Sequence, residues 1–275
     1  TRTRPRRPPV NAARLARLTA EALLPSGPCI LCGADTRSGP VPGLCRACWR
    51  ERTKPDSPAC PVCGVPLPPV DGQDAHPCGQ CLQDPPTFEA HASAFVYAGP
   101  VRVLVLLYKD QKRYPLARLL GRAVARRVKA AWPEAAWDAV VFVPSPLRRR
   151  LVRGFEPAGL VAREAARLLG IPCHRWLVPR KAPQAQKGLS KAARKLNVRA
   201  AFTARKADVE GQRLLLVDDV RTTGATLREG ALVLARCGAR VHAATFAMVL
   251  SRDLDLVSAP LESDGSGSLP HRSEP

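Results

Sequence analysis

The segment 214–226 constrains the fold more than any other part of this 275-residue chain. It reads Leu-Leu-Leu-Val-Asp-Asp-Val-Arg-Thr-Thr-Gly-Ala-Thr. Its apolar start, residues 214–217, has the continuous hydrophobicity of a parallel strand that is covered on both faces. Asp218 and Asp219 follow at the exposed carboxyl end of that strand, where open α/β sheets bind ligands. The segment therefore predicts a parallel α/β fold with a ligand site at one edge of the sheet.

The residues after the two acids have the composition of a phosphate-binding turn. Hydroxyl side chains and Gly224 lie between the strand and a helix expected at about 227–237. Free backbone N–H groups and the positive end of a helix dipole favour anions at such a turn, while carboxylates accept hydrogen bonds from sugar hydroxyls. A strand ended by acids and an ordinary capped turn is the simpler alternative. A P-loop nucleotidase fits poorly, because the chain has no Gly-x-x-x-x-Gly-Lys-Ser/Thr segment.

This segment closely resembles the phosphoribosyl pyrophosphate (PRPP) motif of type I phosphoribosyltransferases. The resemblance implies that Asp218 and Asp219 are the catalytic acids and hold the ribose 2′ and 3′ hydroxyls. It also implies that residues 222–226 wrap the 5′-phosphate and that magnesium accompanies PRPP. The implied PRPP-binding residues are Asp218, Asp219, Val220, Arg221, Thr222, Thr223, Gly224, Ala225 and Thr226.

Eight of the ten cysteines form four Cys-x-x-Cys pairs in the first third of the chain. Two thiolates on such a tight knuckle can face one ion, and two knuckles complete a tetrahedral four-sulfur zinc site. Disulfides are the competing interpretation, but a cytoplasmic chain disfavours them. Two structural zinc ions are therefore expected, held by successive or by interleaved pairs. The expected ligands are Cys29, Cys32, Cys45, Cys48, Cys60, Cys63, Cys78 and Cys81.

The cysteine-rich segment is too poor in large apolar residues to fold unaided. Zinc must stabilise it, and roughly 10 to 16 kcal/mol per structural site is sufficient. Four thiolates leave no open position for water, which favours a scaffold or a partner-binding role over metal catalysis. The expected domains are a basic tail with a short helix at 1–24, a double zinc ribbon at 25–88, a phosphoribosyltransferase-like domain at 89–250 and a disordered tail at 251–275.

Beyond the ribbons, the chain alternates between strand and helix patterns in the α/β manner. The expected strands are 91–97, 139–143, 173–178, 213–217 and 240–249, with a weaker one at 201–204. The expected helices are 101–108, 116–130, 157–169 and 227–237. A parallel sheet with helices on both faces is the natural closure of this pattern.

Two further segments are basic. Segment 142–155 follows a strand and precedes a helix, so its arginines are expected at the same edge as the acids, and segment 180–197 resembles a mobile loop that closes over an anion. Residues 146–206 carry sixteen Lys and Arg against two acids, which suits pyrophosphate and also a nucleic-acid backbone. The expected contacts to pyrophosphate or DNA phosphates are Lys109, Arg148, Arg149, Arg150 and Arg153, and the loop residues are Gln186, Arg194 and Asn197.

Together these residues resemble the ComF family of competence-associated proteins, which join a double zinc ribbon to a phosphoribosyltransferase-like domain. The resemblance covers about residues 23–250 and implies a role in natural transformation, in bringing single-stranded DNA into the cytoplasm. The chain departs from the family at Glu156 and Pro157, where a carboxylate would repel pyrophosphate, and at 182–185. The resemblance rests on the four Cys-x-x-Cys pairs, Leu107-Tyr-Lys109, Val143-Pro-Ser-Pro146, Arg153-Gly-Phe155, Gln186-x-x-Leu189-Ser190, Arg194-x-x-Asn197 and segment 218–226.

Charge and hydropathy limit the location and the partners. A formal net charge of +20 favours polyanionic partners and says nothing about the fold. No apolar run approaches the roughly 20 residues of a membrane span. The start of the chain also lacks the apolar core of a secretory signal. We therefore expect a cytoplasmic protein with no membrane span.

Three functions stay open at this point. The first is a pentosyltransferase that displaces pyrophosphate from PRPP with an unknown acceptor, and the second is a non-catalytic DNA-uptake factor that binds single strands and a partner such as a helicase. The third is a regulator that senses PRPP. DNA binding alone does not require the intact segment 218–226, and thirteen aromatic residues offer few stacking platforms for bases. We favour a transformation role with a retained phosphoribosyl site, whether or not turnover occurs.

Overall fold

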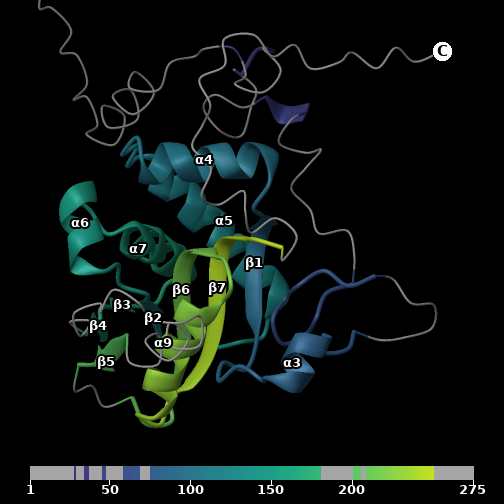
Figure 1. Ribbon diagram of the computed structural model, residues 1–275, viewed down its shortest axis with the longest axis vertical. Coiled ribbons are helices and arrows are strands. Elements are labelled where there is room, and N and C mark those ends of the chain that lie inside the picture. The colour runs from purple at the N-terminus through teal and green to yellow at the C-terminus, as the bar shows by residue number, and fades with distance from the viewer. Residues whose placement is uncertain are drawn as a thin grey trace, which may run out of the picture.

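The structure is a computed structural model that describes residues 28, 34–36, 45–47, 58–68, 75–180, 201–205 and 209–250. The described chain mixes strands and helices, with one or two helices after β1, β2 and β6 (Figure 1). In order, the elements are α3 (Gly79–Gln83), β1 (His91–Val96), α4 (Gly99–Lys109), α5 (Leu116–Ala131), β2 (Ala139–Phe142), α6 (Leu147–Arg153), α7 (Pro157–Leu169), β3 (Cys173–His174), β4 (Leu177–Pro179), β5 (Phe202–Ala204), β6 (Arg213–Arg221), α9 (Ala225–Ala235) and β7 (Arg240–Met248).

A five-stranded sheet forms the centre of the fold, with strand order β1-β7-β6-β2-β3. Every neighbouring pair in it is parallel. The four apolar residues that open β6, residues 214–217, are fully buried, as their continuous hydrophobicity predicts for a strand covered on both faces. In the register of β6 and β7, Asp218 lies opposite Thr245.

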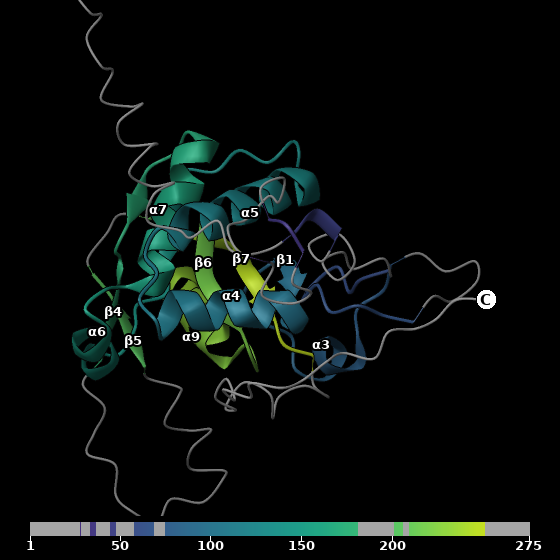
Figure 2. The ribbon, with the colours of Figure 1, turned by 90° about the horizontal axis from the view of Figure 1, so that it is seen from above.

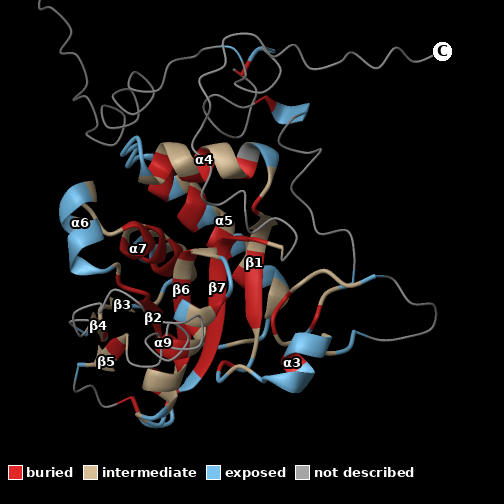
Figure 3. Ribbon diagram, in the orientation of Figure 1, coloured by how far each residue is buried: buried red, intermediate tan, exposed pale blue. Residues whose placement is uncertain are grey.

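Helices cover both faces of this sheet, as the alternation predicts (Figures 1 and 2). α4, α5 and α7 pack on one face, around a core that includes Leu215 and Val217. α9 packs on the other face, around a core that includes Leu214 and Leu216. Burial is concentrated in the strands and in the inward sides of these helices (Figure 3). Among the described residues, no helix is long and apolar enough to cross a membrane.

The expected strand at 173–178 forms as two separate strands. β3 pairs with β2 in the main sheet, whereas β4 pairs antiparallel with β5 in a small second sheet. The break follows from a change of partner, because the carbonyl oxygen of Trp176 accepts a hydrogen bond from the backbone N–H of Arg205. The weaker strand expected at 201–204 is confirmed as β5.

Segment 142–155 contains a helix, α6, that the sequence pattern does not reveal. None of its residues is buried, so it has no apolar face that would produce a helical period. Gly154 ends α6 in the left-handed conformation, with φ of 79°. Phe155 then packs edge-on against Tyr108 and Tyr114, and this contact fixes the position of α6.

Candidate functional site

The two acids lie inside β6, which continues to Arg221. Asp219 is only 6% exposed and forms an ion pair with Lys109, whose Nζ lies 2.7 Å from Oδ1. The expectation of two acids at an exposed strand end is therefore wrong for Asp219. The parallel pairing extends beyond the apolar run because β7 supplies a partner as far as Met248.

Asp218 belongs to the opposite face of the sheet, because side chains alternate along a strand. Burial and the adjoining charge of Asp219 raise the pKa of Asp218 well above its usual range. Its Oδ1 accepts a hydrogen bond from the backbone N–H of Asp219 at 2.8 Å. The site thus contains the Asp219 carboxylate, which Lys109 neutralises, and the Asp218 carboxyl group, whose ionisation is disfavoured. Both precede the turn that resembles a phosphate-binding loop.

The turn after β6 depends on Gly224. This residue has φ of 79° and serves as N-cap of α9, a conformation that L side chains rarely adopt. The hydroxyl residues Thr222, Thr223 and Thr226 are exposed around it. α9 begins at Ala225, so its N-terminal backbone N–H groups and the positive end of its dipole lie at this turn. Such an arrangement can bind a phosphate group.

The structure brings four of the expected zinc ligands together. The Sγ atoms of Cys60, Cys63, Cys78 and Cys81 all lie within 4.8 Å of one another, which is the successive pairing. The Sγ atoms of Cys63 and Cys78 are 3.6 Å apart, while Zn–S bonds of about 2.3 Å in a tetrahedron would place sulfurs about 3.8 Å apart. The donor set and its spacing therefore fit a structural zinc ion.

Backbone groups stabilise the thiolate of Cys60. The N–H groups of Cys63 and Cys78 donate to Cys60 Sγ at 3.4 and 3.3 Å. Burial acts to raise the pKa of Cys60, but hydrogen bonds, mainly from these N–H groups, outweigh it and lower the pKa to about 7. Burial instead raises the pKa of Cys63 and Cys81. A thiol with a lowered pKa loses its proton readily to a metal.

The structure describes fewer residues of the first expected ribbon than of the second. Cys45 is 6% exposed and belongs to the same buried cluster as Tyr97 and Val101. Cys29, Cys32 and Cys48 lie outside the described residues. An antiparallel bridge joins Pro28 to Asp35, and another joins Ala59 to Pro66. Each bridge spans one Cys-x-x-Cys-Gly sequence.

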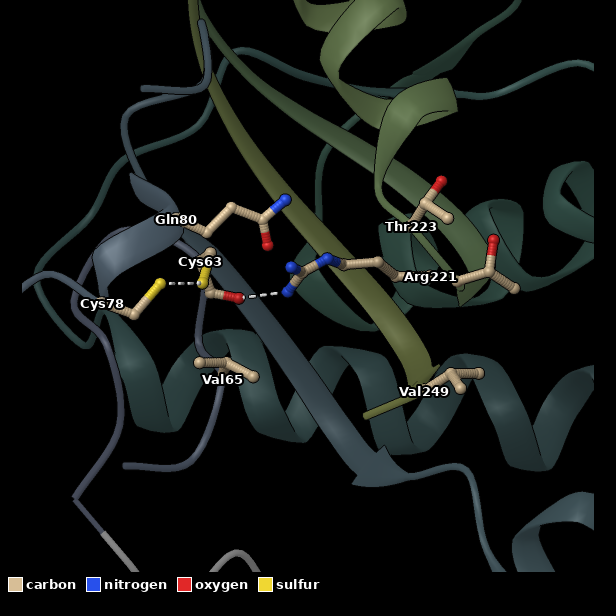
Figure 4. A pocket seen from close by; sticks show the side chains of 8 residues that line it. Cys63, Val65, Cys78, Gln80, Arg221, Thr223 and Val249 are labelled. Atoms are coloured by element: carbon tan, nitrogen blue, oxygen red, sulfur yellow. Dashed lines mark hydrogen bonds between the residues drawn. The ribbon is translucent and has the colours of Figure 1, made fainter. Parts of the chain in front are cut away.

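The second ribbon is joined to the sheet through the carbonyl oxygen of Cys63. This oxygen accepts a hydrogen bond from His91 Nδ1 at 2.9 Å. It accepts another from Arg221 Nη1 (Figure 4). Burial lowers the pKa of His91 to about 3, so its ring is neutral. Its Nε2 lies 3.0 Å from the hydroxyl of Thr245, the residue opposite Asp218. Sequence reasoning missed this role of His91, since no local pattern marks it.

A pocket of about 310 Å³ lies between the ribbon and the turn. Residues from both parts of the chain line it, and Figure 4 shows Arg221 extending from the sheet toward Cys63. The lining residues are Cys63, Val65, Cys78, Gln80, Arg221, Thr222, Thr223 and Val249.

The basic residues expected to contact pyrophosphate or DNA phosphates do not all lie together at the turn. Lys109 is engaged by Asp219, and Arg153 lies 3.8 Å from Asp110. Views from two directions place α6 on the opposite side of the molecule from α3 of the ribbon (Figures 1 and 2). The arginines that α6 carries are Arg148, Arg149, Arg150 and Arg153. The expected loop residues Gln186, Arg194 and Asn197 lie outside the described residues.

Glu156 does not project freely toward a pyrophosphate site. Its Oε1 accepts a hydrogen bond from the backbone N–H of Ser145 at 2.8 Å. The carboxylate therefore braces the turn between β2 and α6.

Comparisons with known proteins agree with this architecture. A double zinc ribbon domain profile matches residues 19–82, and a phosphoribosyl transferase domain profile matches residues 151–262. An adenine phosphoribosyltransferase from Saccharomyces cerevisiae superposes with a TM-score of 0.34 and 22% identity, covering 54% of this chain and 73% of its own. The parallel sheet and the two profiles define a phosphoribosyltransferase-fold protein with a double zinc ribbon.

Its relatives identify the family. The chain is 35% identical over 201 residues to the DNA utilization protein YhgH of Salmonella typhi, covering 72% of this chain and 86% of that protein. It is 33% identical to competence protein F of Haemophilus influenzae, covering 71% and 86%. Competence protein ComFC of Bacillus subtilis is 24% identical, covering 76% and 84%. The chain belongs to the ComF family.

Proposed function

We propose that this protein binds PRPP with magnesium at the carboxyl edge of β6 and acts in the handling of DNA during natural transformation. One observation carries the ligand assignment: Asp218, Asp219 and the Gly224 turn lie together where β6 leads into α9. The acids would hold the ribose hydroxyls and the turn the 5′-phosphate. The names of the relatives, which refer to competence and DNA utilization, support the biological role.

Calorimetry with PRPP and magnesium tests this ligand. The wild type should bind saturably. Replacing both acids, Asp218→Asn with Asp219→Asn, should weaken binding roughly 10- to 100-fold, because each lost charge-assisted hydrogen bond contributes about 1.5 to 3 kcal/mol and some compensation is expected. Equal affinity in the two proteins would refute the assignment. A pyrophosphate-release assay over nucleobases then separates a transferase from a sensor that only binds PRPP.

We propose two zinc ions as the resident metals, one for each ribbon. Four thiolates would hold each ion and leave no position for water, so zinc would stabilise the fold and take no part in bond making. Thiolate ligands require a reducing compartment, which supports a cytoplasmic location. A protein partner such as a helicase would find an apolar contact at Leu82 of α3, which is 68% exposed.

A second candidate, binding of single-stranded DNA, rests on α6. Arg148 and Arg149 are exposed on this helix, which carries no acidic residue. The logarithm of DNA affinity should fall with the logarithm of salt concentration by about 0.7 for each phosphate that is neutralised. Replacing Arg148, Arg149 and Arg150 with glutamate should therefore make this slope shallower by about two units. The loss should be alike for all sequences, because phosphate contacts carry no base information.

Another basic helix provides the matched control. Arg118, Arg122 and Arg126 are exposed on α5, so reversing them changes the net charge by the same amount. Fluorescence anisotropy with a labelled oligonucleotide compares the two triple variants. An unchanged salt slope in the α6 variant would remove α6 from the DNA path, and a flattened slope in the α5 variant would move that path to α5.

A further inference from the structure

We propose that the second zinc ribbon is part of the ligand site and that Arg221 is the positioning residue that links the zinc cluster to the phosphate-binding turn. This inference rests on the proposed binding of a phosphorylated sugar and adds to it a dependence on zinc. The pocket takes its walls from the ribbon and from the end of β6 (Figure 4).

Arg221 touches both walls. Its Nη1 donates to the Cys63 carbonyl oxygen. At its other end, a Cβ atom built on Gly224 would lie only 3.1 Å from Nε of Arg221, so the side chain packs directly over the turn. This Nε is buried and has no hydrogen-bond partner among the described residues. A buried guanidinium N–H without a partner is costly unless an acceptor arrives, and an anion at the turn would supply one.

The position of the Cys63 carbonyl depends on the knuckle around it. Gly64 turns the chain there with φ of 69°, and its N–H donates to the Cys60 carbonyl at 2.8 Å. The four cysteine sulfurs lie within 4.8 Å of one another, so bonds from one zinc ion to all four would hold the knuckle closed. Loss of zinc would therefore open the knuckle and move the carbonyl that holds Arg221.

The charges on the two sides of the pocket also favour a link through Arg221. Four thiolates and one zinc ion carry a net charge of about −2, and a phosphate ester at the turn carries up to about −2. Two anionic centres on either side of one pocket repel, and a cation between them reduces this repulsion. Arg221 occupies that place.

Hydrogen exchange of the full chain tests the link without a ligand. Zinc removal from the wild type should increase exchange of the amides in 222–226 by about tenfold or more, corresponding to about 1.4 kcal/mol of lost protection. Amides of residues 231–234, in the buried part of α9, should stay protected. In Arg221→Gln, exchange at 222–226 should be fast with zinc bound, and Arg221→Lys should restore part of the protection.

A matched variant separates this effect from simple loss of a contact. Arg228 of α9 also binds the ribbon side of the molecule, with Nη2 donating to the Asp84 carbonyl at 2.7 Å, but it does not line the pocket. Arg228→Gln should leave the exchange at 222–226 dependent on zinc. Protection at 222–226 that is equal with and without zinc in the wild type would overturn the inference.

Binding of ribose 5-phosphate by calorimetry completes the test. Arg221→Gln should weaken it roughly 10-fold or more, as expected for a lost charge-assisted contact, whereas Arg228→Gln should match the wild type. If the wild type binds but Arg221→Gln binds equally well, the inference fails and the proposed function stands. The wild type could instead fail to bind ribose 5-phosphate while the protection of amides 222–226 from hydrogen exchange depends on zinc. In that case the proposed function fails, but the link between the zinc cluster and the turn stands.

Discussion

At the residue scale, the adjacent acids Asp218 and Asp219 are not equivalent. Asp219 is buried on the face that carries α4 and is neutralised by Lys109 at 2.7 Å. Asp218 lies on the other face, and its raised pKa means that its charge works against the folded state. The sequence predicts the pair and its edge of the sheet, but it cannot reveal this division, because Lys109 lies 110 residues away from Asp219 in the chain.

The two acids should therefore respond oppositely to neutralisation. Asp219→Asn leaves Lys109 without its partner and should destabilise the fold by about 1 to 3 kcal/mol. Asp218→Asn removes a disfavoured charge and should leave the melting temperature at pH 7 unchanged or higher. Thermal unfolding of the two single variants is the measurement. A lower melting temperature for Asp218→Asn than for Asp219→Asn would contradict this account.

His91 should make stability depend on pH. Its pKa of about 3 in the folded chain lies below the usual 6.5, so below pH 6.5 the unfolded chain binds a proton that the folded chain does not. Stability is full above pH 6.5 and falls as the pH drops, by about 1 kcal/mol between pH 6.5 and 5.5. Urea unfolding of the zinc-loaded protein at these two values measures the fall. His91→Gln should lose this component, and an identical fall in the variant would count against it.

At the scale of elements, the sequence predicts those whose hydrophobic pattern is local. α7 forms at Pro157–Leu169, as expected, because its apolar residues repeat at helical spacing. α6 has no buried face and therefore no pattern. The junction between ribbon and sheet is also invisible to local patterns, because it joins Cys63 to Arg221 across 158 positions. Gly33 and Gly64, which follow the first and third Cys-x-x-Cys pairs, are the local signals that point to the knuckles.

Gly64 should be essential for the second knuckle. A Cβ atom there would lie 2.7 Å from the His91 carbonyl oxygen, and φ is 69°, so Gly64→Ala should cost about 1 to 2 kcal/mol or more from the backbone conformation alone. The variant should release zinc to a chelator faster than the wild type. Gly79→Ala is the control, because nothing lies within 4 Å of its Cβ position. Equal release rates for the two variants would rule out this role of Gly64.

At the scale of the whole molecule, the second ribbon has a small core of its own that is hydrogen-bonded to the larger domain. Cys60, Cys63 and Cys81 form a buried cluster distinct from the two cores that flank the sheet. Polar contacts join this cluster to His91 and Arg221. Zinc loss should therefore unfold the ribbon locally and disturb one edge of the sheet, while β6, β7 and α9 stay folded.

The purified protein should contain two zinc ions per chain. Eight cysteines in four knuckles suit two closed four-thiolate sites, and four of those cysteines already lie together. Elemental analysis of freshly prepared, reduced protein gives the stoichiometry. Less than one zinc per chain would contradict the proposed pair of sites.

The turn between β6 and α9 is proposed to bind the phosphate of a phosphorylated sugar. Amide NMR of the full chain during titration with ribose 5-phosphate reports on this turn residue by residue. Binding should produce saturable shifts of the Gly224 and Ala225 amides, which lie at the start of α9. The amide of Gly170, which caps the far end of α7 in the same left-handed conformation, should not move. Saturable binding that leaves Gly224 unshifted, or no binding at all, would contradict the claim.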